Sequence, residues 1–273
     1  MSAAVTEPSQ SRYRVIITRP EPQASQWQQC LTEQGLASAV VPVMEIVELA
    51  DNAARERVKQ LVLNLDHYQK AIFVSRNAVH YGLSWLDAYW PQLPLGIDYF
   101  AVGGATAREL EQADIRVSAL GRDDSAMNSE ALLADPALQR VAGEKIVIFR
   151  GVGGRDLMAT TLRERGAQVD YCELYQRQLP AEAESCLLSV LPSGAGQWDI
   201  LSVHSGESLG NLTQLLRRHP ALGREAFACP LLVPGERVAA LARKAGFDQL
   251  LVARNAGDNA MLAALNSYIA HKG

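Results

Sequence analysis

Short apolar runs, rich in β-branched residues, recur along the chain, and each is followed by a stretch with helical spacing of its apolar positions. Seven of these runs predict strands, at residues 15–18, 71–75, 99–102, 145–149, 199–203, 231–233 and 249–252. Nearly continuous apolar strands that alternate with helices are typical of a parallel sheet covered on both faces. The pattern therefore predicts an α/β protein built from doubly wound parallel sheets.

Two further segments, 43–49 and 172–179, alternate polar and apolar residues instead. A period of two describes a strand with one exposed face rather than a buried parallel strand. The two segments occupy equivalent places, each just after a strand–helix–strand pattern. We interpret them as paired strands that connect two domains.

The chain also contains a long internal repeat. Residues 14–19 (RVIITR) reappear as residues 145–150 (KIVIFR), and both copies lead through a Pro- or Gly-rich turn into a helical pattern. Residues 71–75 and 102–104 have counterparts at 200–204 and 233–235. A repeat of over a hundred residues indicates a duplicated domain, since solenoid periods are roughly 20–50 residues. We expect two similar α/β layers with a crevice between them.

The boundary between the two domains is left open by this pattern. At 273 residues, two domains are the natural expectation. The domains could follow one another with a division near residue 125. Alternatively, the chain could leave the first domain at Val43 and return to it at Tyr175.

Composition narrows the class of protein. A formal net charge of -4 argues against a nucleic-acid partner. The four cysteines form no C-x-x-C pair and the histidines do not cluster, so we expect no metal site and a reducing cytoplasm. No apolar run approaches the ~18 residues of a membrane span, and residues 1–10 are expected to form a disordered tail.

Residues suited to binding anions follow the predicted strands. Ligands of open parallel sheets bind beyond the carboxyl ends of the strands, where backbone N–H groups at helix N-termini attract negative charge. The candidate binding residues are Arg19, Ser75, Arg76, Asn77, Gly104, Thr106, Arg150, Gly153, Gly154, Ser205, Gly206 and Gly235. Together they would suit a ligand with several separated carboxylates or phosphates.

Each of these residues also has a purely structural interpretation. Thr106 and Glu109 could form a capping box, and Ser75, Asn77 and Ser205 are suitable helix N-caps. Arg19 and Arg150 could simply be solvated at strand ends. The 151–154 segment resembles a dinucleotide loop only loosely, because it lacks the third glycine of G-x-G-x-x-G. The pattern equally allows Tyr175 to pack its ring or to face the crevice.

Taken in order, several segments resemble the uroporphyrinogen-III synthase family, from Tyr13 to Leu265. They are residues 15–20 (VIITRP), 42–46 (PVMEI), 73–79 (FVSRNAV), 102–107 (VGGATA), 150–155 (RGVGGR), 165–166 (RG), 173–177 (ELYQR) and 205–207 (SGE). The resemblance implies a monomer of two flavodoxin-like domains. The first would comprise residues 11–42 and 180–270 and the second residues 50–171, joined by a two-stranded antiparallel ladder of residues 43–49 and 172–179.

The resemblance further implies a cofactor-independent lyase that uses no metal. Its substrate would be the linear tetrapyrrole hydroxymethylbilane, which is cyclised with inversion of ring D through loss of water and a spiro intermediate. Tyr175 matches the family's tyrosine and would assist departure of the hydroxyl without being essential; Thr106 matches a threonine of the family's turn. The chain departs from the family's usual text at His204, where a small hydroxylic residue is common, and at Pro234–Gly235–Glu236. The alternatives are a non-catalytic two-domain binding protein for an anionic small molecule and a nucleotide-dependent enzyme.

Overall fold

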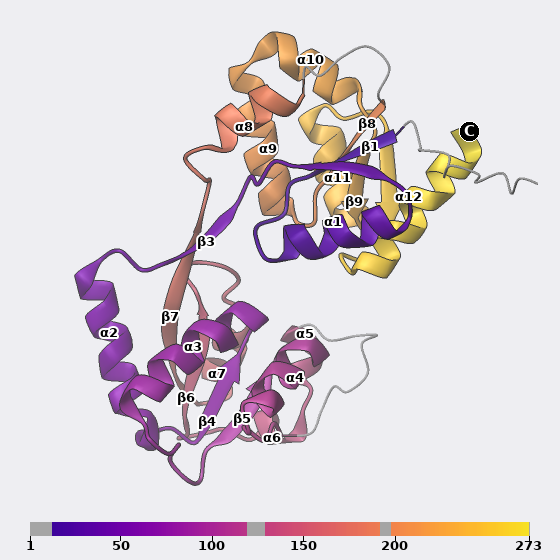
Figure 1. Cartoon of the computed structure of the whole chain (residues 1–273). Coiled ribbons are helices and arrows are strands. Elements are labelled where there is room, and N and C mark those ends of the chain that lie inside the picture. Colours follow the sequence, from indigo (N-terminus) through magenta and orange to yellow (C-terminus); the bar gives the residue numbers. More distant parts are fainter. Residues whose placement is uncertain (1–12, 119–128, 192–197, 273) are drawn as a thin grey trace, which may run out of the picture. The chain divides into compact units, whose positions relative to one another are not determined.

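The computed structural model describes residues 13–118, 129–191 and 198–272 (Figure 1). The expected tail at residues 1–10 lies outside this part. The chain forms two compact units, one of Met1–Glu45 with Gln178–Gly273 and the other of Ile46–Arg177. No helix within the described ranges has the length and apolar character needed to cross a membrane.

The first unit consists of alternating strands and helices drawn from both ends of the chain. Its elements are β1 (Tyr13–Ile17), α1 (Gln23–Glu33), β2 (Ala37–Val40), α8 (Ala183–Val190), β8 (Trp198–Ser202), α9 (Gly206–Arg218), α10 (Pro220–Ala228), β9 (Leu231–Pro234), α11 (Glu236–Ala245), β10 (Leu250–Ala253) and α12 (Asp258–Lys272). The sheet has the order β10-β9-β8-β1-β2, and every pairing in it is parallel.

Both faces of this sheet are buried, as its continuous apolar strands predict. Successive side chains of a strand point to opposite faces. Val15 and Ile17 accordingly pack with α1 and α12, whereas Ile16 packs with the side chains of α8, α9 and α11. The prediction of parallel α/β sheets is confirmed here.

The second unit repeats this design with a different chain order. Its elements are β3 (Glu45–Glu48), α2 (Asn52–Leu63), a 3₁₀ turn (Leu65–His67), β4 (Lys70–Phe73), α3 (Arg76–Tyr89), β5 (Asp98–Ala101), α4 (Gly104–Gln112), α5 (Ser129–Leu133), α6 (Pro136–Gln139), β6 (Lys145–Gly151), α7 (Leu157–Glu164) and β7 (Gln168–Gln178). The sheet order is β3-β7-β6-β4-β5, and the pairs from β7 to β5 are parallel. Helices α2, α3 and α4 cover one face, while α5 and α7 cover the other.

The long strand β7 departs from the predicted half-exposed pattern. Its pairing with β6 runs in register to Arg150 and Glu173 and then shifts, so that Gly151 lies opposite Tyr175. A β-bulge of this kind adds one residue to a strand and interrupts the alternation of its faces. Leu174 and Tyr175 are therefore both buried although they are neighbours in sequence. The expectation of one exposed face fails at this point.

The repeat is visible in equivalent helix starts, with one correction. Ser75 caps α3 and Ser205 caps α9, each by accepting a hydrogen bond from the backbone N–H three residues further on. The sequence repeat aligns Ser75 with His204, and the structural equivalence lies one residue later. The loop after β8 is one residue longer than the loop after β4, which apolar periodicity cannot show.

Candidate functional site

In the second unit, the candidate residues gather at one edge of the sheet. Strands β4, β5 and β6 are parallel neighbours, so their carboxyl ends meet on the same side. Ser75 follows β4, Gly104 follows β5, and the glycine segment 151–154 follows the arginine of β6. The topology therefore brings together the candidates that the sequence places after three separate strands.

The N-terminus of α3 combines a cap with charged and amide side chains. Ser75 Oγ accepts a hydrogen bond of 3.1 Å from the N–H of Ala78. Arg76 and Asn77 are the first two residues of the helix and are partly exposed. The Arg76 guanidinium lies 3.6 Å from the carboxylate of Glu109 on α4. The predicted cap is confirmed for Ser75, and the cap leaves Asn77 inside the first turn.

The predicted capping box at Thr106 is wrong. Helix α4 begins at Gly104, so its N-cap is Gly103, which has a φ of 97° and no side chain with which to cap the helix. A positive φ favours glycine, because it has no Cβ to collide with the backbone. Thr106 is consequently in the first turn and only 3% exposed. Glu109 forms its ion pair with Arg76 rather than reaching back to the helix start.

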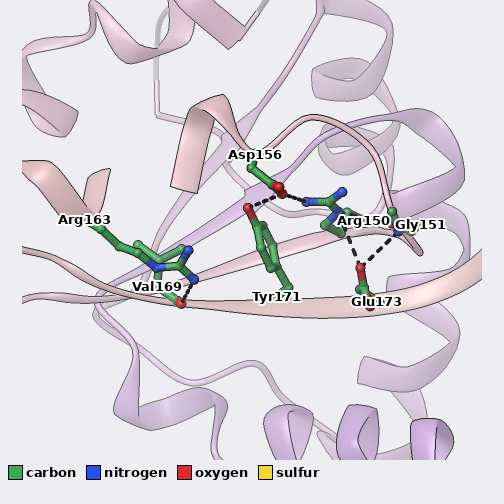
Figure 2. Close-up of polar contacts among 8 residues, drawn as sticks. Arg150, Gly151, Asp156, Arg163, Val169, Tyr171 and Glu173 are labelled. Atoms are coloured by element: carbon green, nitrogen blue, oxygen red, sulfur yellow. Dashed lines mark hydrogen bonds and ion pairs between the residues drawn. The ribbon is translucent and has the colours of Figure 1, made fainter. Parts of the chain in front are cut away.

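Arg150 is held by protein groups and is not a solvated strand-end residue (Figure 2). Its guanidinium carbon lies 4.3 Å from the ring centre of Tyr171, and its Nη1 lies 3.4 Å from Asp156 Oδ1. Its Nε donates to the carbonyl of Gly151 and lies 3.9 Å from Glu173 Oε1. Burial raises the pKa of Tyr171, and its hydrogen bond to Asp156 adds to this effect. Arg150 thus provides the positive charge beneath the glycine segment.

The glycines after Arg150 have roles that need no nucleotide. The N–H of Gly153, which has a φ of 72°, donates a hydrogen bond of 3.2 Å to Glu173 Oε1. A Cβ on Gly154 would lie 2.8 Å from Arg150 Nη2. These contacts explain both glycines by backbone conformation and by the closeness of the arginine. They lend no support to a dinucleotide loop.

Tyr175 lies in a tight slot and is 3% exposed. Its ring stacks on Tyr81 of α3 with 5.2 Å between centroids, and a Cβ on Gly151 would lie only 2.5 Å from Tyr175 Cε2. The hydroxyl lies 3.1 Å from Ser75 Oγ. Burial raises the pKa of Tyr81, with smaller contributions from Glu48 and Tyr175. Tyr175 therefore packs its ring and directs its hydroxyl to Ser75.

In the first unit, the candidates also follow parallel strands. Arg19 comes after β1, and its Nη1 is 2.5 Å from Asp258 Oδ1 at the start of α12. Ser205 caps α9 and is followed by Gly206, where a Cβ would lie 3.3 Å from a methyl of Leu241. Gly235, with a φ of 84°, is the N-cap of α11. Arg19 is ion-paired and partly buried, in contrast to the solvated interpretation.

His204, the departure from the family pattern, is a partly buried residue whose two ring nitrogens are covered by the protein. Its ring packs edge-on against Trp27 with 5.7 Å between centroids. Burial lowers its pKa to about 3, and the nearby charge of Arg19 acts in the same direction. His204 is therefore neutral near pH 7, packs against Trp27 and is not poised as a base.

Three contacts of the site were not predicted from sequence. Tyr81 and Gly151 enclose the ring of Tyr175, and Glu173 accepts from the N–H of Gly153. Tyr81 lies six residues after Ser75, a separation that does not predict a shared neighbour. Glu173 and Gly151 become neighbours of the site only through the bulged pairing of β6 and β7. A repeat search cannot supply that register.

The fold and the site define an α/β protein of two units, each carrying anion-suited helix N-termini at the carboxyl edge of a parallel sheet. The model of the family described as uroporphyrinogen-III synthase HemD matches residues 25–263. The chain belongs to the uroporphyrinogen-III synthase family.

Full-length relatives are similar throughout the chain. It is 34% identical to the uroporphyrinogen-III synthase of Escherichia coli over 265 residues, covering 92% of this chain and 99% of the relative. It is 36% identical to that of Salmonella typhimurium over 262 residues, with the same two coverages.

Two solved structures share the fold. A uroporphyrinogen III synthase of Thermus thermophilus is 20% identical with a TM-score of 0.60, and the match covers 96% of this chain and 100% of that one. The enzyme of Helicobacter pylori is 15% identical with a TM-score of 0.59, and the match covers 94% and 99% of the respective chains. At these identities the likeness shows the fold alone.

Proposed function

We propose that this protein is a cofactor-independent lyase that cyclises hydroxymethylbilane with inversion of ring D, a step of tetrapyrrole (heme) biosynthesis. The observation that carries the proposal is family membership over most of the chain, with relatives matched over 99% of their own length. Loss of the terminal hydroxyl as water gives an azafulvene cation. The substituted carbon of ring D attacks it to form a spiro intermediate, which fragments and recloses as uroporphyrinogen III.

The substrate is a polycarboxylate, and the carboxyl edge of each sheet suits it. Backbone N–H groups at helix N-termini carry partial positive charge and bind carboxylates. We propose that the starts of α3, α4, α9 and α11 bind acetate and propionate arms, with the backbone of the glycine segment contributing. The residues assigned to binding are Arg19, Ser75, Arg76, Asn77, Gly104, Thr106, Arg150, Gly153, Gly154, Ser205, Gly206 and Gly235.

Tyr175 is the proposed source of the proton that turns the departing hydroxyl into water. A phenol has a pKa near 10, so it is a moderate general acid. The pyrroles themselves stabilise the cation, which leaves the protein mainly to orient the bilane. The hydrogen bond between Tyr175 and Ser75 supports a chemical role for this hydroxyl beyond packing.

We also propose a domain organisation for the chain. Residues 11–42 with 180–270, and residues 50–171, would act as two flavodoxin-like domains joined by an antiparallel ladder of residues 43–49 and 172–179. The strands of the first unit lie in the order β2-β1-β8-β9-β10. Numbered within this unit alone, that order is 2-1-3-4-5, which supports the flavodoxin-like assignment.

The four cysteines are free, which supports a reducing cytoplasm. We propose a monomer, to be tested by light scattering.

The test is to supply hydroxymethylbilane and to separate the oxidised porphyrin products. The proposed function predicts mainly the type III isomer. Exclusive formation of the symmetric type I isomer, which arises spontaneously, would refute it and would favour the alternative of a non-catalytic binding protein for an anionic small molecule.

A further inference from the structure

Nearly all of the surface of Tyr175 is covered by the protein. The residue is 3% exposed, with its ring confined between Tyr81 and the backbone of Gly151. A direct hydrogen bond from this phenol to a substrate oxygen would require the ring to leave that slot. The group assigned to supply the proton therefore needs an intermediary at the surface.

Ser75 is placed to be that intermediary. Its Oγ is 3.1 Å from the hydroxyl of Tyr175 and accepts from the N–H of Ala78. A serine hydroxyl accepts up to two hydrogen bonds and donates one. When Tyr175 donates to Ser75, both accepting positions are filled and the serine hydrogen is left to donate. Within the described ranges, no further hydrogen-bond partner of Ser75 Oγ is present.

The surroundings of Ser75 match this role. Ser75 is partly exposed at the carboxyl end of β4, next to Arg76 and Asn77, which are candidate substrate-binding residues. It begins a fourteen-residue helix, whose N-terminus favours negative charge. Ser75 is thus placed where the backbone N–H groups of α3 favour negative charge.

We propose that Ser75 is a catalytic residue that relays the proton of Tyr175 to the departing hydroxyl. This inference rests on the proposed function. As the C–O bond breaks, Ser75 gives its hydrogen to the leaving oxygen, which departs as water, and takes the hydrogen of Tyr175. Tyr175 becomes a phenolate. It regains a proton, again through Ser75, when the carbon of the last ring closure loses its hydrogen, so atoms and charges balance over the cycle.

The relay requires both hydroxyls. An aliphatic hydroxyl alone is a far weaker acid than a phenol, whereas the phenol of Tyr175 belongs to a residue that is only 3% exposed. Removing either one breaks the same path. The two losses should therefore not add, as expected for residues that act as one unit.

The experiment compares Ser75→Ala, Tyr175→Phe and the double variant in single turnovers of hydroxymethylbilane. We expect each single variant to lower the rate of the chemical step by on the order of 10- to 100-fold, toward the lower end of general-acid effects. The double variant should match Ser75→Ala. Ser75→Thr, which keeps the hydroxyl, should recover most of the rate.

Proton counting separates the relay from a purely structural role. In mixtures of H₂O and D₂O, two protons in flight give a curved dependence of rate on deuterium fraction for the unaltered protein. Tyr175→Phe should give a straight line. A straight line for the unaltered protein would overturn the relay.

Two further variants separate the relay from helix capping. Ser75→Asn keeps an N-cap without an acidic hydrogen, so it should retain stability and remain slow. Asp51→Ala removes the cap of α2, whose carboxylate accepts from Ala53 and Ala54, and should lower Tm while leaving the rate unchanged. A slow Asp51→Ala or a fast Ser75→Asn would overturn the relay.

The remaining outcomes divide as follows. Full activity of Ser75→Ala with a slow Tyr175→Phe would overturn the relay while leaving the proposed function intact. Full activity of Tyr175→Phe would overturn the relay and remove the tyrosine from the mechanism. Exclusive type I product from the unaltered protein would instead refute the proposed function itself.

Discussion

At the residue scale, Gly151 illustrates how a single missing side chain shapes the site. A Cβ there would lie 2.5 Å from Cε2 and 2.8 Å from Cζ of Tyr175, distances that the packed ring cannot accept without moving. This glycine belongs to the segment that loosely resembles a nucleotide loop. Its role in this structure is to let a tyrosine ring lie against the backbone.

We predict that Gly151→Ala displaces Tyr175 and costs roughly 1–3 kcal/mol of unfolding free energy, as overpacking does. Activity should fall at least as far as in Tyr175→Phe, because the hydroxyl loses its alignment with Ser75. Urea unfolding and the hydroxymethylbilane assay measure the two effects. Gly210→Ala is the matched control, since a Cβ in α9 meets nothing within 4 Å. Normal activity of Gly151→Ala would contradict the prediction.

His204 predicts a pH dependence of stability. Its folded pKa of about 3 lies below the ~6.5 of an unfolded histidine, so the unfolded chain binds more protons between these values. The stability is fully present above pH 6.5 and is lost as pH falls toward 3. At pH 5 the loss from this residue should be about 2 kcal/mol.

Urea unfolding at pH 8 and pH 5 checks this expectation. His204→Leu should remove about that much of the pH-dependent loss, whereas His67→Gln, at an exposed position, should leave it unchanged. An unaltered pH dependence in His204→Leu would show that the buried ring is not responsible.

At the element scale, an ion pair joins the neighbouring strands β1 and β8 of the first unit. Arg14 Nε lies 2.7 Å from Asp199 Oδ1 and its Nη2 lies 2.8 Å from Oδ2, while Nη2 also donates to the carbonyl of Val190. Such a two-bond pair joins β1 to β8, which are far apart in sequence but adjacent in the sheet. Both side chains are mostly buried.

We predict that Asp199→Ala destabilises the protein by about 2–4 kcal/mol, because it leaves a largely buried guanidinium without its carboxylate. Glu48→Ala breaks the exposed pair with Arg55 and should cost less than ~1 kcal/mol. Thermal and urea unfolding compare the two. Equal losses would mean that burial of the pair does not set its contribution.

The strands themselves were predictable from the sequence, but their irregularities were not. Continuous apolar runs such as 145–149 mark buried strands, because both faces of a parallel sheet must be apolar. The bulge that buries Leu174 beside Tyr175 depends on pairing with β6, which periodicity does not encode. The start of α4 at Gly104, which makes Gly103 and not Thr106 its N-cap, depends on the turn after β5.

The candidate site was predictable to a similar degree. The rule that ligands bind at carboxyl strand ends selected Ser75, Arg150 and Ser205, which the structure places at such ends. The contact partners of the site residues could not be predicted from the sequence. Arg19 finds Asp258, which is 239 residues away, and Tyr175 finds Ser75, which is 100 residues away. Only the folded topology makes such pairs neighbours.

At the scale of the whole molecule, the two units differ in whether a single segment of the chain contains all of their strands. The second unit is one continuous segment, Ile46–Arg177, with apolar clusters on both faces of its sheet. The first unit needs both ends of the chain, since β1 and β2 come from one end and β8, β9 and β10 from the other. Strand β1 pairs along five residues with β8, the middle strand of the sheet.

We predict that a fragment of residues 46–177 folds alone, whereas a fragment of residues 178–273 does not. Without β1, strand β8 becomes a sheet edge, and Ile200 and Leu232 lose the cover that Trp27 and Leu31 of α1 provide. Far-UV circular dichroism and thermal unfolding test both fragments, and adding a peptide of residues 1–45 to the second fragment should restore a cooperative transition. Cooperative unfolding of residues 178–273 without that peptide would contradict the prediction, because it would show that β8, β9 and β10 close a core without β1, the strand that pairs with β8.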